Sequence, residues 1–91
     1  MKFAWDPKKA ASNLNKHGVS FEEASTVFGD PLSETFDDPE HSLDEHRFVI
    51  VGRSLSGKLL FVSHSDDGHT VRIISVRELT RAETKQYEEG F

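Results

Sequence analysis

Residues 46–78, with the sequence HRFVIVGRSLSGKLLFVSHSDDGHTVRIISVRE, decide the fold of this chain. Three segments of this stretch, 46–54, 58–65 and 70–78, are rich in apolar and β-branched residues, and the two connections between them are short and contain glycine. Segments joined in this way are typical of β-hairpins. The stretch therefore predicts three strands that form an antiparallel meander.

A strand and a helix are predicted at the N-terminus. Residues 3–5 alternate apolar and small side chains, and the Asp6-Pro7 pair that follows suits the N-cap and the first position of a helix. The helix is expected to run to His17, because Gly18 can adopt the left-handed conformation that ends helices.

Two further helices begin at capping-box patterns, in which a Ser or Thr is followed three residues later by Glu. Ser20-Phe21-Glu22-Glu23 predicts a helix that ends at Gly29, and Thr80-Arg81-Ala82-Glu83 predicts one that reaches about Glu89. Between them, residues 33–36 predict a short edge strand, and an acidic loop over residues 37–40 should follow it.

The predicted order of elements is β-α-α-β-β-β-β-α, in one domain over residues 1–91. Helices packed mainly on one face of an antiparallel sheet give an α+β, two-layer domain. The other face of the sheet should then be partly open, and polar side chains can collect there.

Composition excludes several classes of protein. The chain has no cysteine, so it forms neither a disulfide framework nor a zinc–thiolate site. No apolar run is long enough for a signal peptide or a membrane span, and we expect a cytoplasmic protein. No Gly-rich phosphate loop is present, and no cofactor is predicted.

The charges of the chain are unevenly distributed. The net charge of −5 argues against a nucleic-acid partner. However, residues 46–86 hold seven Lys or Arg and four acidic residues, and every Arg of the chain lies among them. Arginine suits bidentate recognition of phosphate, so this half could bind phosphate groups or simply present a solvated surface.

Each of the three predicted strands places basic residues near the end of an apolar row. Alternation puts Arg72 and Arg77 on opposite faces of their strand. Basic side chains at strand ends either form a cationic rim around the sheet or reach out to water. The residues concerned are Arg47, Arg53, Lys58, Arg72 and Arg77.

His64 is the best candidate for a general acid or base, because it ends a strand beside two serines and histidine titrates near neutral pH. A metal site is the rival interpretation of the histidines. A pair such as His41 with Asp44 or Glu45 can be drawn, but no spacing matches a known ligand pattern, and no metal is predicted.

Motifs along nearly the whole chain resemble the BrnT toxin family. The opening FAWDPKKAASNLNKHGVSFEEASTVFGDPL (residues 3–32) carries the pattern W-D-P-x-K-A-x-x-N-x-x-K-H-G-V-S-F-E-E-A. The stretches HSLDEHR, VGRS and LLFVSHS follow, and RIISVRELTRAETKQYE (residues 72–88) completes the likeness. The opening and the R-I-I-S-x-R segment are together highly specific.

The resemblance implies a toxin of a type II toxin–antitoxin system with a RelE-like ribonuclease fold. It implies RNA cleavage that inhibits translation, and neutralisation by a BrnA-like antitoxin with a DNA-binding domain. Operator DNA would then be bound only through the antitoxin, which could also bring toxins together in an oligomer. On the matching positions, the site residues implied are Arg53, His64, Arg72 and Arg77, with Arg47 beside them.

Cleavage is expected to proceed without metal, by attack of the RNA 2′-hydroxyl on the neighbouring phosphate. Such a reaction needs a base, an acid and cations near the phosphorane oxygens. We assign the cation role to Arg53, Arg72 and Arg77, the acid or base role to His64, and substrate positioning to Lys58 and Arg47. Two alternatives stay open: a non-catalytic module that docks an antitoxin, and a metal-dependent phosphodiesterase.

Overall fold

The protein is described here by a computed structural model, which covers residues 1–41 and 45–90. Besides helices and strands, the described chain contains two 3₁₀ helices, η1 and η2, which were not predicted from the sequence. In chain order the elements are β1 (Lys2–Ala4), α1 (Pro7–His17), α2 (Phe21–Thr26), η1 (Val27–Gly29), β2 (Glu34–Asp37), η2 (Pro39–His41), β3 (Arg47–Arg53), β4 (Leu59–Asp66), β5 (Thr70–Glu78) and α3 (Arg81–Glu89).

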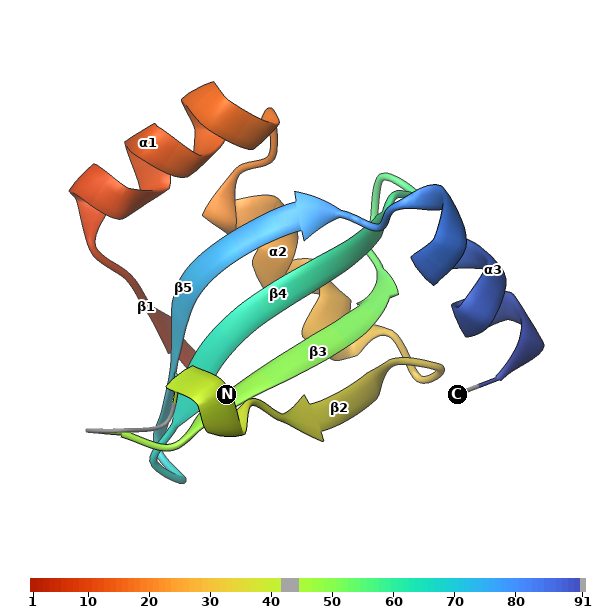
Figure 1. The fold of residues 1–91 in the computed structure, drawn as a ribbon. Coiled ribbons are helices and arrows are strands. Elements are labelled where there is room, and N and C mark those ends of the chain that lie inside the picture. Colours follow the sequence, from red (N-terminus) through yellow and green to blue (C-terminus); the bar gives the residue numbers. More distant parts are fainter. Residues whose placement is uncertain (42–44, 91) are drawn as a thin grey trace.

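The strands form one five-stranded sheet in the order β1-β5-β4-β3-β2 (Figure 1). The predicted meander is confirmed, because β3 pairs antiparallel with β4 and β4 with β5. β2 extends it as an antiparallel edge strand. β1 pairs parallel with β5 at the other edge, which places the first residues of the chain beside the last strand.

α1 begins and ends as its sequence predicts, and a buried asparagine fixes it to the sheet. Asp6 caps the helix through a bond from the Lys8 backbone N–H, and Gly18 ends it at φ 72°. The Asn13 side chain donates to the backbone carbonyls of Val19 and Val76 and accepts from the Val76 N–H. This amide therefore joins α1 to β5 through hydrogen bonds.

The core lies between the sheet and the two N-terminal helices, which cover one face (Figure 1). Phe21 and Leu60 are its largest fully buried side chains. Ile50 of β3 and Ile73 of β5 also belong to the core, so every strand of the meander contributes to it. The α+β class with α1 and α2 on one face is confirmed.

The capping box predicted for the second helix is only half formed. Ser20 Oγ accepts from the Glu23 N–H, as expected. The Glu23 carboxylate instead accepts hydrogen bonds from Ser54 and Ser56 in the β3–β4 turn. These two bonds hold the pKa of Glu23 below its usual value. Glu23 thus ties α2 to a hairpin 31 residues away, a contact that local sequence does not reveal.

A β-bulge in β5 changes which of its side chains share a face. The pairing of β4 with β5 shifts between Ser63 and His64, and Ile74 is the extra residue. The expectation that Arg72 and Arg77 lie on opposite faces is therefore wrong, because one inserted residue reverses the alternation beyond it. Both arginines lie on the face away from the core, whereas the buried residues of β5 are Val71, Ile73 and Val76.

α3 stands apart from the other two helices, beside the end of the sheet where β5 ends (Figure 1). It begins at a complete capping box formed by Thr80 and Glu83 and contains no buried residue. A hydrogen bond from the Tyr87 hydroxyl to the Leu32 carbonyl connects its far end to the segment before β2. Within the described chain, no helix has the length and apolarity needed to cross a membrane.

Candidate functional site

The face of the sheet that α1 and α2 leave open carries a groove of about 640 Å³. Its floor is apolar and consists of alternate residues of β3 and β4 together with the bulge residue of β5. Serine hydroxyls, acidic side chains from β2 and η2, and the first turns of α3 surround this floor. The lining residues are Phe36, Asp37, Asp38, Glu40, Arg47, Val49, Val51, Phe61, Ser63, Ile74, Ser75, Leu79, Glu83 and Gln86.

Three basic side chains lie at one end of this face. Arg47 and Arg72 both pair with Ser65 of β4 between them, so the two arginines are on the same rung, two strands apart. Lys2 of β1 is two residues from Ala4, which pairs with Arg72. Paired residues of adjacent strands point to the same face, and strands lie about 4.8 Å apart. These cations therefore form a row across the sheet, which we call the basic row.

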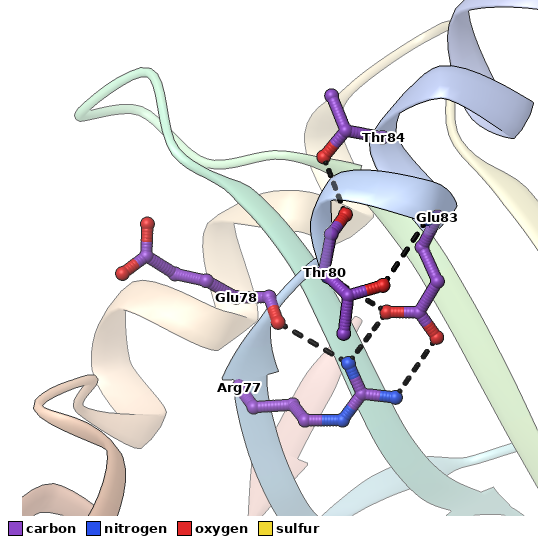
Figure 2. A network of polar contacts seen from close by, with 5 residues as sticks. All are labelled: Arg77, Glu78, Thr80, Glu83 and Thr84. Carbon is purple, nitrogen blue, oxygen red and sulfur yellow. Dashed lines mark hydrogen bonds and ion pairs between the residues drawn. The ribbon is translucent and has the colours of Figure 1, made fainter.

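Arg77 lies toward the other end of the same face and is held firmly in place (Figure 2). Its Nη1 and Nη2 donate to the two carboxylate oxygens of Glu83 at 2.7 and 3.0 Å, and Nη1 also donates to the Glu78 carbonyl. Its guanidinium carbon lies 4.1 Å from the centroid of the Phe61 ring. The ion pair raises the pKa of Arg77 and lowers that of Glu83 to about 2, so both groups are charged at neutral pH.

Arg53 and Lys58 lie at the turn between β3 and β4, away from the basic row. Arg53 is six residues from Arg47 along β3, a distance of about 20 Å. Its Nη1 donates to the Gly57 carbonyl, and its backbone N–H donates to Asp30. Lys58 is exposed beside this turn, and its charge helps to lower the pKa of Glu23. Arg53 of β3 therefore does not meet Arg72 and Arg77 of β5 in one pocket.

His64 points into the core and is 3% exposed. Its ring packs against Phe28 at 4.8 Å and Phe48 at 5.8 Å between centroids. Its Nδ1 lies 3.3 Å from the Val62 carbonyl oxygen, and burial lowers its pKa. The acid–base role predicted for His64 conflicts with this position, because alternation along β4 places it on the face opposite the groove.

Two features of this face were not predicted from the sequence. Ser65 lies between the two arginines of the basic row, but its position becomes visible only from the register of three strands. Glu83 matched the capping pattern, which gave no sign that the same carboxylate also binds Arg77. The sequence signal available for this ion pair was the spacing of six residues between Arg77, near the end of β5, and Glu83, in the first turn of α3.

The metal interpretation finds no support in the described residues. Among residues 1–41 and 45–90, no three His, Asp or Glu side chains cluster closely enough to bind a metal ion. His46 Nε2 lies 2.9 Å from Asp37 Oδ1, but this is a single pair on the surface. The proposed pairing of His41 with Asp44 or Glu45 depends on side chains outside the described part of the chain.

Comparison with known proteins agrees with this fold. A family model described as "Ribonuclease toxin, BrnT, of type II toxin-antitoxin system" matches residues 5–83. The chain belongs to the BrnT family. The type II assignment also means that this BrnT-family toxin has an antitoxin partner. No curated protein sequence matches it.

The fold of this BrnT-family toxin is similar to that of a solved relative. The crystal structure of the ribonuclease toxin BrnT from Brucella abortus superposes with a TM-score of 0.69 at 23% sequence identity. The match covers 89% of this chain and 99% of the Brucella chain. At this identity the likeness establishes the fold, while the arrangement of charged side chains described above belongs to this chain.

Proposed function

We propose that this BrnT-family toxin cleaves RNA on the open face of its sheet, with the basic row holding the phosphate backbone. The observation that carries the proposal is the rung that joins Arg47, which lines the groove, to Arg72 through Ser65. Two arginines whose backbones lie about 10 Å apart can engage neighbouring phosphates. The apolar floor formed by Val49, Val51 and Phe61 suits the faces of nucleobases.

The reaction that fits this surface is attack of a 2′-hydroxyl on the adjacent phosphorus. A bond forms between O2′ and phosphorus and the bond from phosphorus to O5′ breaks, while solvent water accepts the proton lost by O2′ and supplies the proton gained at O5′. Arg72 and Arg47 would stabilise the negative charge that builds on the phosphorane oxygens, which is the task that a metal ion performs in other nucleases. We therefore propose that cleavage needs no metal.

The roles first assigned to individual residues change with this proposal. Arg77 would act as a fixed cation at the far side of the groove, because Glu83 and Phe61 restrict its movement. Arg53 and Lys58 would contact only a longer RNA that extends past the β3–β4 turn. We do not retain His64 as acid or base, since it is 3% exposed on the opposite face.

The proposal is tested with purified protein and RNA in excess EDTA. Wild-type protein should cut RNA, and Arg72→Gln should lower the rate about 100-fold, as removal of a preorganised charge donor does in other enzymes. Arg81→Gln, which removes the same charge from an exposed position of α3, is the matched control and should keep wild-type activity. A substrate with a 2′-deoxy sugar at the cut site should resist cleavage. Cutting of that substrate would contradict the mechanism.

The same experiment separates the alternatives. Cutting that appears only after a divalent metal is added would support a metal-dependent phosphodiesterase. No cutting under either condition would favour a non-catalytic module, for which the apolar groove floor would be the antitoxin-binding surface.

We also propose that the antitoxin is a BrnA-like protein with a DNA-binding domain, and that RNA cleavage inhibits translation. Expression of the toxin alone should stop protein synthesis and growth, and co-expression of the neighbouring open reading frame should restore both. Growth arrest that this neighbour does not relieve would contradict the pairing.

A further inference from the structure

The first 19 residues are basic in an acidic protein. They contain Lys2, Lys8, Lys9, Lys16 and one acidic residue, Asp6, which gives a net charge of +3. The rest of the chain holds seven basic and fifteen acidic residues, a net charge of −8. α1 itself contains no acidic residue. Positive charge is therefore concentrated on β1 and α1.

These four lysines are exposed and are not neutralised by the protein. All four are classed among the exposed residues. Among the ion pairs of the described chain, none involves them, whereas Arg77 is paired with Glu83 and Arg47 lies 3.7 Å from Glu45. A polyanion could therefore reach their ammonium groups without breaking an existing contact.

The positions of Lys8 and Lys9 do not help α1 to form. Both lie in the first turn, where the helix dipole is positive and a cation is unfavourable, and the first turn itself contains no acidic residue, so only the Asp6 cap beside it offsets them. The stability of α1 comes instead from the Asp6 cap and from the hydrogen bonds of Asn13. A requirement other than helix stability best explains two lysines at this end.

The lysines of α1 continue the basic row, which includes Lys2, around the edge of the sheet. Lys2 belongs to β1, whose Ala4 pairs with Arg72. α1 begins at Pro7, three residues after β1 ends, and packs beside β5 (Figure 1). Lys9 and Lys16 are seven residues apart and so lie on one side of the helix, about 10 Å from each other along its axis. The chain thus carries positive charge from the open face to the adjacent helix.

From these observations we infer that α1 forms a second phosphate-binding surface, so that the substrate is an extended RNA that passes from the groove around the β1 edge. This inference rests on the proposed RNA cleavage. Lysine contacts to phosphate depend on counterion release, so they add affinity for any sequence and make binding steeply dependent on salt. An RNA of a few nucleotides would fill only the groove.

The test compares two double variants that remove equal charge from exposed helical positions. Lys8→Gln/Lys9→Gln alters α1, and Arg81→Gln/Lys85→Gln alters α3 as the matched control. Affinity for an RNA of about 20 nucleotides, blocked by a 2′-deoxy sugar at the cut site, is measured by fluorescence polarisation at several salt concentrations. Cleavage of a groove-sized RNA of four or five nucleotides is measured in parallel, and circular dichroism verifies folding.

We expect the α1 variant to bind the long RNA at least tenfold more weakly at low salt than the α3 variant does. The plot of log affinity against log salt should be less steep by about 1.4, because two lysine contacts are removed and each phosphate contact to a single strand contributes about 0.7. Cleavage of the short RNA should be unchanged. Adding Lys16→Gln should weaken long-RNA binding further.

The outcomes that overturn the inference differ from those that overturn the nuclease. Equal long-RNA affinity and equal salt slope in the α1 variant and wild type would overturn it, as would equal losses in the two double variants. In either case, cleavage of the short RNA by wild-type protein would leave the proposed function intact. Long-RNA binding that depends on the α1 lysines, in a wild-type protein that cuts no RNA, would support the surface and contradict the nuclease.

Discussion

Asn13 shows how one side chain can replace an apolar contact. α1 has few apolar residues, and Leu14 is half exposed. The Asn13 amide compensates by donating two hydrogen bonds and accepting one, all to backbone groups. Buried polar groups are stable only when they are hydrogen-bonded, and this amide uses both its donors and its acceptor. The asparagine of the family's opening pattern is therefore a structural residue in this chain.

Replacement of Asn13 by Asp should lower the free energy of unfolding by about 2–3 kcal/mol. A carboxylate cannot donate, so it would leave two buried carbonyl oxygens without a partner and bring a charge near them. Urea denaturation followed by circular dichroism measures the change. Asn15→Asp on the exposed side of the same helix is the control, with an expected change below about 0.5 kcal/mol. Equal losses in both variants would show that charge on α1, not the amide bonding, is responsible.

Burial of His64 should make folding sensitive to mild acid. The environment of Phe28 and Phe48 lowers the pKa of His64 below the usual 6.5, so the folded protein disfavours its protonated form. Below about pH 6.5 the unfolded chain binds a proton at this residue more readily than the folded protein does. The stability contributed by neutral His64 is therefore complete above this pH and decreases as the pH falls toward 5.

We expect the free energy of unfolding to fall between pH 7.5 and pH 5 by more in wild-type protein than in His64→Phe. Phenylalanine fits an aromatic environment and does not titrate. Denaturation curves at both pH values, in buffers of equal ionic strength, provide the comparison. The same pH dependence in both proteins would mean that other groups determine the acid sensitivity.

At the scale of elements, Gly52 sets how closely β3 approaches the segment before β2. A Cβ atom at this position would lie 2.9 Å from Ser33 Cβ and 3.0 Å from Val27 Cγ1, closer than side chains normally pack. The absence of a side chain thus allows β3 and η1 to meet. The glycine in the V-G-R-S stretch serves packing.

Gly52→Ala should destabilise the protein by about 1–3 kcal/mol, because the added methyl group forces neighbouring groups apart. Gly29→Ala is a close control, since a Cβ there meets nothing within 4 Å and the backbone has no positive φ. That variant should be neutral or slightly more stable. Thermal unfolding of the two variants side by side tests the difference, and a Gly52→Ala protein as stable as wild type would contradict the packing argument.

On the scale of the whole molecule, stability is concentrated in the centre of the sheet. β4 lies between two strands and contributes Leu60 and Val62, both fully buried. In contrast, all four residues of β2 are exposed, and α3 buries none of its residues. The elements at the edges of the open face are therefore the ones that can open most easily.

Amide hydrogen exchange should reveal this gradient. We expect the slowest exchange in β4 and the central residues of β3 and β5, and exchange faster by at least tenfold in α3. Glu83→Gln, which weakens the ion pair to Arg77, should accelerate exchange in α3 and leave β4 unchanged. Slow exchange in α3 comparable to that of β4 would show that the helix is held by more than the contacts described.

Local signals in the sequence determined most of the elements of this protein. Asp6, Pro7 and Gly18 set the ends of α1 because capping and left-handed backbone depend on adjacent residues alone. Glycine-containing turns and apolar runs likewise determined the meander of β3, β4 and β5. The family resemblance was also present in the sequence, because its motifs are contiguous.

Only the tertiary structure decided which side chains meet. The bulge at Ile74 brought Arg72 and Arg77 to one face, and strand register placed Arg47 on the rung of Arg72. Helix packing decided which face of β4 is buried, so His64 lies in the core, where its neighbours come from distant segments. Alternation along a strand is a local rule, but a single inserted residue or a shift of register reverses it, and these depend on pairing between residues far apart in the chain.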